Sequence, residues 1–142
     1  MLSKSSKYGI RAVLHIAHES QQGRRVGLVE IANYLDTPQH FTGKIIQQLA
    51  KRNIIDSIKG PNGGFEMSED QRLNNNIRSI VEIIDGNDLY VKCGLGLDHC
   101  HDDNPCPIHT MYKEARLKII NIHCNFSIEQ LASSLDYDAV IK

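Results

Sequence analysis

Apolar residues recur at helical spacing along most of the chain, and this pattern predicts a mainly α-helical protein. In residues 5–18 an apolar stripe is formed by Tyr8, Val13, Leu14, Ile16 and Ala17. Side chains at such intervals share one face of a helix, which can then be buried. The same reasoning predicts helices at residues 5–18, 28–36, 37–53, 76–85, 107–125 and 128–135.

Capping residues indicate where two of these helices begin and end. Thr37 can accept a hydrogen bond as an N-cap, Pro38 suits a first helical turn, and Asn53 can close the helix in the left-handed conformation. Ser127 and Gln130 have the spacing of a capping box before the last helix. The predicted boundaries therefore rest on end signals as well as on periodicity.

One segment departs from the helical period. Residues 54–68, "IIDSIKGPNGGFEMS", alternate apolar and polar positions on both sides of a Gly/Pro/Asn turn, which is typical of a β-hairpin. A closely spaced helix pair followed by a hairpin is the order of a winged helix-turn-helix, whose second helix enters the major groove of DNA. The fold class predicted is mainly α with a small β-hairpin.

Charge is divided unevenly along the chain. Residues 1–60 hold nine Lys/Arg against four Asp/Glu, a net charge of +5, whereas residues 61–142 hold seven against thirteen, a net charge of −6. A basic half is expected of a phosphate-binding surface, although two solvated faces of ordinary composition would give the same division.

Several classes of protein are disfavoured. No stretch approaches the ~20 apolar residues of a membrane span, and the N-terminus lacks the apolar segment of a signal peptide, so we expect a cytoplasmic protein without membrane contact. An enzyme is also disfavoured: "GPNGGF" lacks the Lys-Ser/Thr and the following helix of a phosphate-binding loop, and no serine nucleophile motif is present.

Residues 92–109, "KCGLGLDHCHDDNPCPIH", concentrate three of the four cysteines and three of the seven histidines. By composition the stretch could be a disulfide loop, a zinc site, an iron–sulfur site or a redox switch. Cytoplasmic thiols stay reduced, which disfavours the disulfide loop. Cys93, Cys100 and Cys106 are spaced more widely than the close pairs of most structural zinc sites, and soft sulfur ligands also suit iron–sulfur clusters.

The quoted segments, with "SKYGIRAVLHIA" and "IANYLDTPQHFTGKIIQQLAKRNIIDSIKGPNGGF", resemble the Rrf-two family of bacterial transcription regulators, in particular the iron–sulfur-sensing IscR-like and NsrR-like members. The resemblance implies a homodimer of winged helices, a long C-terminal dimerisation helix, and a cluster in the loop before that helix. It also implies binding to double-stranded DNA at a roughly palindromic operator. Residues 1–86 would be the DNA-binding domain, 87–106 the cluster-binding loop, and 107–142 the dimerisation and C-terminal helices.

The candidate DNA-binding residues lie where such a module reaches DNA. The front of the recognition helix points into the groove, the wing tip lies beside the phosphate backbone or the minor groove, and the start of the first helix can hold phosphates unless it frays. The candidates are Gln39, His40, Phe41, Gly43 and Lys44 on the helix, Lys59 and Pro61 on the wing, and Lys4 and Lys7 at the N-terminus.

The resemblance also suggests the cluster ligands. Three cysteines leave one ligand missing, and His109, three residues after Cys106, has the spacing that IscR-like members use. NsrR-like members use an acidic residue near the position of Lys7, so the resemblance favours [2Fe–2S] over [4Fe–4S], although the first cysteine interval is one residue longer than in the IscR-like pattern. Competing donors are Asp98, His99, His101 and Asp102.

The remaining thiol and histidines have ordinary structural interpretations. Cys124 is expected to be a buried free thiol in the long helix, and His15, His18 and His123 are expected to be structural. The function expected is therefore a dimeric regulator, a repressor, controlled by an iron–sulfur cluster that senses cluster status, nitric oxide or redox stress. The alternative is a winged-helix regulator with a structural zinc or a thiol redox switch in the cysteine loop.

Overall fold

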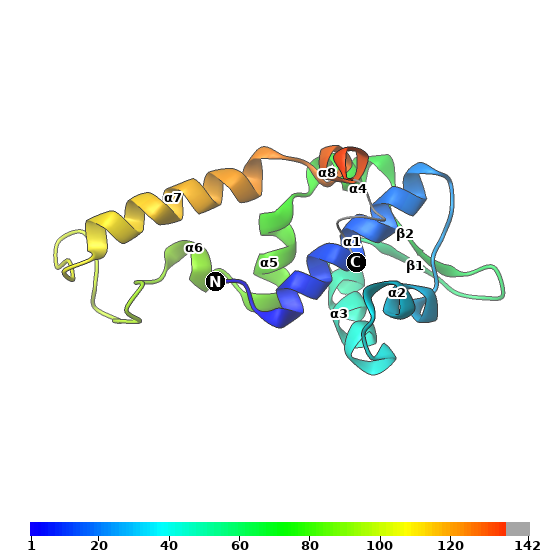
Figure 1. Cartoon of the computed structure of the whole chain (residues 1–142), viewed down its shortest axis with the longest axis horizontal. Coiled ribbons are helices and arrows are strands. Elements are labelled where there is room, and N and C mark those ends of the chain that lie inside the picture. Colours follow the sequence, from blue (N-terminus) through cyan, green and yellow to red (C-terminus); the bar gives the residue numbers. More distant parts are fainter. Residues whose placement is uncertain (136–142) are drawn as a thin grey trace.

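The computed structural model describes residues 1–135, and this part of the chain is mainly helical with one two-stranded hairpin (Figure 1). The predicted fold class is therefore confirmed. The elements are α1 (Lys4–Gln21), α2 (Leu28–Leu35), α3 (Gln39–Lys51), β1 (Asp56–Ile58), β2 (Gly64–Glu66), α4 (Glu69–Asn74), α5 (Ile77–Asp85), α6 (Asp88–Val91), α7 (His109–Asn125) and α8 (Ile128–Ser134).

Helix α1 is the centre of the core. It packs against α2, α3, α5, α8 and the hairpin. Residues 12–17 are all buried, including the predicted Val13, Leu14, Ile16 and Ala17, whereas Tyr8 is half-buried. Fully buried side chains include Ile16, Ile31, Ile46, Leu49, Ile80 and Ile128, so every helix that packs on α1 contributes one. Each fully buried aliphatic side chain contributes roughly 1.5–3 kcal/mol to stability, and the core therefore fixes the positions of α2 and α3 relative to one another.

The turn between α2 and α3 uses a different cap from the one predicted. Pro38, rather than Thr37, is the N-cap of α3, and no side chain caps it. The hydroxyl of Thr37 instead lies 2.7 Å from that of buried Thr42, and Thr42 donates to the Pro38 carbonyl. The prediction for Thr37 was wrong because its hydroxyl pairs with a second hydroxyl one helical turn away. Asn53 does take the left-handed conformation predicted for it.

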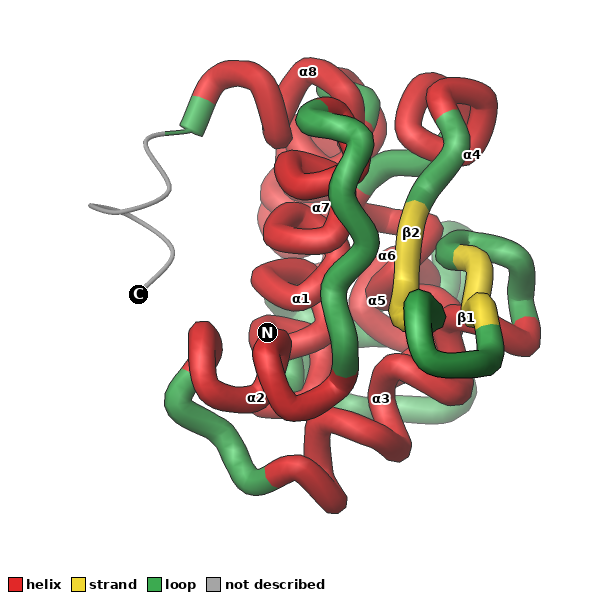
Figure 2. The backbone as a smooth tube through the Cα atoms, turned by 90° about the vertical axis from the view of Figure 1, so that its right-hand side faces the viewer, coloured by secondary structure: helices red, strands yellow, loops and turns green. Residues whose placement is uncertain are grey.

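The hairpin forms a wing whose second strand packs on α1 (Figure 2). β1 and β2 are antiparallel, with Ser57 opposite Phe65, and Phe65 also exchanges two backbone hydrogen bonds with Val26 at 2.8 and 3.1 Å. The turn requires glycine at Gly63, because a Cβ atom there would lie 2.2 Å from the Ile58 carbonyl oxygen. The base of the wing is thus fixed by the segment before α2, while its tip extends into solvent.

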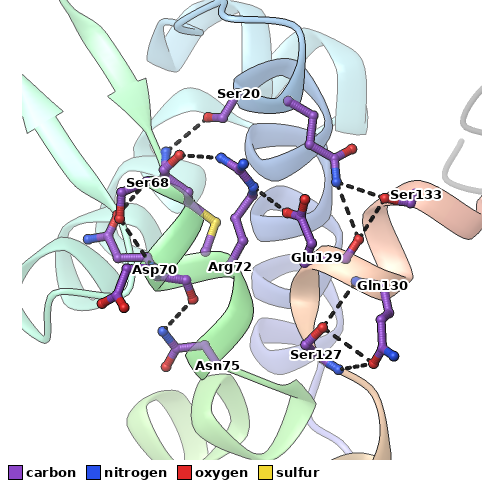
Figure 3. A network of polar contacts seen from close by, with 12 residues as sticks. Ser20, Ser68, Asp70, Arg72, Asn75, Ser127, Glu129, Gln130 and Ser133 are labelled. Atoms are coloured by element: carbon purple, nitrogen blue, oxygen red, sulfur yellow. Dashed lines mark hydrogen bonds and ion pairs between the residues drawn. The ribbon is translucent and has the colours of Figure 1, made fainter.

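Polar contacts hold helix α8 against α1 and α4 (Figure 3). Arg72 of α4 pairs with Glu129 of α8 and donates to the Met67 carbonyl at 2.7 Å. Gln21, at the end of α1, donates to the Ser133 hydroxyl at 2.9 Å. The predicted Ser127–Gln130 capping box is present. These contacts hold the C-terminal end of α7 close to the base of the wing.

Other details differ from the sequence-based prediction. The short helices α4 and α6 were not predicted, because six and four residues are too few to show a period. Helix α7 begins at His109, not at Pro107. Cys124 is exposed rather than buried, because α7 buries none of its side chains in the described chain. None of the helices among residues 1–135 has the length and hydrophobicity of a membrane span.

His15 is the least satisfied polar group of the core. It is 4% exposed, stacks on Tyr34 with ring centroids 3.9 Å apart, and neither ring nitrogen has a hydrogen-bond partner within the described chain. Burial lowers the pKa of His15, although Glu19 and Glu30 oppose the shift. The unfolded chain therefore takes up this proton first as the pH falls, and stability is lost below the ordinary histidine pKa of about 6.5.

Replacing His15 with phenylalanine should stabilise the fold. His15→Phe keeps the stacked ring and removes the unpaired nitrogens, which should raise the free energy of unfolding by about 1–2 kcal/mol at pH 7. The gain should grow between pH 7 and pH 5, because the variant lacks the titrating group. Urea unfolding at both pH values measures this, with His18→Gln on the same helix as the control. A loss of stability in His15→Phe would contradict this interpretation of the core.

Candidate metal centre and nucleic-acid interface

The three cysteines of residues 92–108, hereafter the cysteine loop, converge at the start of α7. Their sulfur atoms all lie within 4.8 Å of one another, and the sulfurs of Cys93 and Cys106 are 3.7 Å apart. Two metal–sulfur bonds of ~2.3 Å at a tetrahedral angle would place their sulfurs about 3.8 Å apart. The predicted convergence of Cys93, Cys100 and Cys106 is therefore present, at spacings that suit ligands of a soft metal.

His109 lies beside this thiol cluster and is oriented by its neighbours. Its Nδ1 atom is 3.2 Å from the Cys100 sulfur, and its Nε2 atom is 2.9 Å from Asp102. Asp102 in turn accepts two hydrogen bonds from Lys113, at 2.7 and 2.9 Å. A metal-binding histidine commonly donates its second nitrogen to a carboxylate, which fixes the ring and leaves the first nitrogen free to bind.

Local electrostatics favour an anionic site. Backbone N–H groups of Leu97 and Leu95 lower the pKa of the Cys93 thiol to about 7. At Cys100 the N–H of Cys106 acts in the same direction, but burial and the neighbouring thiols outweigh it and raise the pKa. Lys113, with a smaller effect from His109, lowers the pKa of Asp102 to about 2. Because thiolates are the metal-binding form of cysteine, crowding the three sulfurs together favours binding of a cation.

The cavity at the site is shaped by the contact between the loop and α7. It measures about 210 Å³ and is lined by the three cysteines, His109, His101 and Asp102 together with Val91, Gly94, Tyr112, Lys113 and Arg116. Gly94 is needed here because a Cβ atom would lie 2.5 Å from the Tyr112 ring. Arg116 donates to the Lys92 carbonyl at 2.7 Å. Both contacts flank Cys93 and hold this part of the loop against α7.

The competing donors are placed less favourably than His109. His101 and Asp102 line the cavity, but Asp102 is already held by Lys113 and His109. Asp98 and His99 do not line this cavity but a second hollow, which shares Cys100 and Cys106 with it and lacks Cys93 and His109. Sequence reasoning missed Lys113, Tyr112 and Arg116, because nothing in their spacing indicates that α7 turns these side chains toward the loop.

The predicted DNA-binding residues of α3 form one surface, apart from Phe41. Gln39, His40, Gly43 and Lys44 line a hollow of about 420 Å³ together with Leu28 and Gln47. Phe41 is half-buried and packs edge-to-face on Tyr8, with ring centroids 5.6 Å apart. Phe41 therefore holds α3 against α1, while its neighbours present polar groups to solvent.

The wing and the N-terminus add exposed charge. Lys59 and Pro61 are exposed at the wing tip, and Lys4 and Lys7 are exposed on the first turns of α1. Sequence reasoning missed Arg25, which pairs with Glu66 at 2.7 Å and donates to the Asn62 carbonyl at 3.2 Å. Arg25 braces the tip of the wing against its base, and its position next to Arg24 in a polar loop gave only a weak signal of this role.

Comparison with solved structures defines the fold. CymR of B. subtilis, titled the global cysteine regulator, superposes with a TM-score of 0.79 at 19% identity, over 96% of this chain and 98% of that one. IscR of T. potens gives a TM-score of 0.72 at 15% identity, over 96% and 89%. The fold is that of winged helix-turn-helix transcription regulators.

Sequence comparison gives the family. The family model described as "Rrf2: Iron-dependent Transcriptional regulator" matches residues 2–134, and the chain therefore belongs to the Rrf2 family of DNA-binding transcriptional regulators. A putative HTH-type transcriptional regulator of Aquifex aeolicus is 29% identical over 92% of this chain and 90% of its own length. The regulator IscR of Yersinia pseudotuberculosis is 23% identical over 95% and 80%. The expectation that the chain is not an enzyme agrees with this membership.

Lys44 gives a direct test of the interface on α3. Lys44→Ala should weaken DNA binding by about 1 kcal/mol or more, because a lysine in the groove contacts guanine or a phosphate. Lys51→Ala, at the exposed opposite end of the same helix, should leave the affinity almost unchanged. Fluorescence anisotropy measures the affinity of both variants for a duplex that is first selected from a pool of random sequences by its binding to the protein. Equal effects of the two substitutions would place the DNA elsewhere.

Proposed function

We propose that the protein is a homodimeric, cytoplasmic repressor whose affinity for operator DNA is set by an iron–sulfur cluster bound to Cys93, Cys100, Cys106 and His109. The observation that carries this proposal is the convergence of three thiols whose sulfurs lie within 4.8 Å of one another, with one of them, that of Cys100, 3.2 Å from a histidine that a carboxylate orients. Membership of a family described as iron-dependent regulators, and the resemblance of the cysteine pattern to iron–sulfur-sensing members, support it further.

A [2Fe–2S] cluster is the form we propose. The four donors fall into two close pairs, Cys93 with Cys106 at 3.7 Å and Cys100 with His109 at 3.2 Å. A [2Fe–2S] cluster has four protein ligands, two for each iron, and histidine can replace cysteine. Lys7, near the position where NsrR-like members supply an acidic ligand, is exposed on α1 and cannot bind a metal as a cation.

When bound, such a cluster supplies a redox-active group that reacts with oxidants and nitric oxide. The chain controls how firmly the group is held. Three thiolates and one imidazole donate less charge than four thiolates. The hydrogen bond that His109 Nε2 donates to Asp102 and the ion pair of Asp102 with Lys113 hold the ring in place. We propose that this mixed ligand set makes occupancy responsive to cluster supply and to oxidants.

The proposed dimer uses the outer face of α7. Ile108, Met111, Ala115, Ile119, Ile122 and Phe126 recur every three or four residues along one stripe. Within it, Met111 is 77% exposed and Ile122 is 59% exposed. An apolar stripe that wide is unfavourable in water unless it is covered. A second copy of α7 is the occupant we propose, and two such modules would meet the half-sites of a palindromic operator.

The contacts of α7 suggest how the loop could influence DNA binding. Its first turn carries His109, and its last turn carries His123, whose Nδ1 lies 2.8 Å from the hydroxyl of buried Tyr90. Beyond it, α8 is tied through Arg72 to the base of the wing. A ligand that orders the loop would then bias the positions of α7 and the wing together, which is a two-state switch.

These roles divide the chain into three regions. We propose that residues 1–86 bind DNA, that residues 87–106 bind the cluster, and that residues 107–142 form the dimerisation and C-terminal helices. Of the last region, residues 136–142 lie outside the part that the structure describes.

Protein purified without oxygen tests the cluster assignment. We expect about two irons and two sulfides per chain, with visible charge-transfer bands that disappear in Cys106→Ala. His109→Ala should lose iron faster under chelator challenge, because one of the four ligands is missing. Cys124→Ser, which changes an exposed thiol on α7, is the matched control and should keep its iron.

Three outcomes would contradict the assignment. Zinc in place of iron, or no metal after reconstitution, would leave the structural-zinc or thiol-switch alternative. About four irons per chain would replace [2Fe–2S] by a larger cluster. Unchanged iron retention in His109→Ala would remove this histidine from the ligand set.

A further inference from the structure

In the metal-free protein, the thiols of the cysteine loop can react with one another to form a disulfide. The sulfurs of Cys93 and Cys106 are 3.7 Å from one another, and a disulfide bond is about 2.05 Å long. Closing this gap needs a shift of less than about 2 Å in a segment that is mostly exposed. Between the two cysteines, Leu95 and Leu97 are 54% and 49% exposed and bury little that would resist the movement.

Cys100 is held differently from the other two cysteines. Its sulfur lies 3.2 Å from His109 Nδ1 and accepts the N–H of Cys106 at 3.3 Å. Both contacts would have to break before Cys100 could rotate into a disulfide. The Cys93 sulfur also accepts the backbone N–H of Leu95 at 3.4 Å, but that bond is made within the loop itself, whereas the contact of Cys100 with His109 ties Cys100 to α7. The geometry therefore favours pairing of Cys93 with Cys106.

We propose that the metal-free protein is a target of peroxides, which convert Cys93 and Cys106 into an intramolecular disulfide and leave Cys100 reduced. One thiolate attacks a peroxide oxygen, which forms a sulfenic acid and releases water or, from an organic peroxide, an alcohol. The second thiol attacks the sulfenic sulfur, the S–S bond forms, and the hydroxyl leaves as water. Overall, two thiols and one hydrogen peroxide give one disulfide and two molecules of water, and an organic hydroperoxide gives one disulfide, one alcohol and one molecule of water.

The disulfide would add a regulatory step to the proposed function, on which this consequence rests. It removes two of the four proposed cluster ligands, so a chain that has lost its cluster to an oxidant could not be reloaded with iron and sulfide. A dithiol reductant would restore the ligands, with the disulfide passing to the reductant. The disulfide would thus persist after peroxide exposure and after loss of the cluster, until a reductant removes it.

Peptide mapping of the full-length, metal-free protein tests the pairing. The reduced, chelator-treated chain is exposed to hydrogen peroxide, its free thiols are alkylated, and it is digested with trypsin and a protease that cleaves before aspartate. Trypsin alone leaves the three loop cysteines on one peptide, residues 93–113, whereas cleavage before Asp98 and Asp103 separates them. We expect residues 93–97 linked to residues 103–113, with Cys100 alkylated.

Substitutions sharpen this test. Cys100→Ser and Cys124→Ser should keep the cross-link, while Cys93→Ser should lose it. A bond to Cys100, a bond between chains, or oxidation to sulfinic acid without a cross-link would overturn the proposal. In a second measurement, the disulfide form should take up almost no iron on reconstitution until dithiothreitol is added, and full uptake without reductant would contradict the regulatory step.

The two proposals can fail separately. The mapping uses metal-free protein, so it gives an answer even if the chain never binds a cluster. A chain that binds iron and sulfide but shows no link between Cys93 and Cys106 would refute only the disulfide. A chain that forms the disulfide but binds no cluster after reduction would refute the proposed function and leave the thiol chemistry standing.

Discussion

Helix α7 buries none of its side chains within the described chain, so its position depends on the contacts that its ends and one side make. At its start, the cysteine loop lies on it through Gly94 and Tyr112. At its end, α8 inserts Ile128 into the core and pairs Glu129 with Arg72. In the proposed function, a helix held in this way carries a disturbance at one end toward the other, and this is the constraint through which we propose that the thiol cluster acts on the DNA-binding module.

The two functional regions are rigid to different degrees. The DNA-binding module is fixed by a continuous apolar core around α1, and its wing is braced by Arg25 and by the bridge between Val26 and Phe65. The cysteine loop has no comparable core, and its order rests on sulfur contacts and a few polar contacts to α7. Segments with few buried apolar contacts are the ones that a ligand can order most readily.

The sequence predicted what depends on periodicity and on residue type. The six long helices, the hairpin and the winged helix-turn-helix order followed from patterns of apolar residues and from turn residues such as Gly63. Helices α4 and α6 were missed because they are shorter than the pattern that reveals a helix. Thr37 was assigned as a cap from its residue type, and the assignment was wrong because its pairing with Thr42 depends on how the turn folds. Cys124 was assigned to the core because free thiols are usually buried, and the assignment was wrong because α7 buries none of its side chains in the described chain.

At the site, the sequence indicated which chemistry is possible but not the geometry. Three thiols and a histidine within seventeen residues predicted a soft-metal site. The orientation of His109 by Asp102 and Lys113 could not be predicted, because it depends on the loop folding back onto the second turn of α7. The closeness of Cys93 and Cys106, thirteen residues apart, has the same origin.

The most direct test of the account compares the affinity of the cluster-loaded and the cluster-free dimer for the same operator. The operator is selected from a pool of random duplexes, and both forms are measured without oxygen at one salt concentration, because affinity for DNA depends strongly on salt. The account predicts at least about a fivefold difference in affinity, the lower range of allosteric coupling, and no such difference in Cys106→Ala. Equal affinities of the two forms would show that the loop does not control DNA binding.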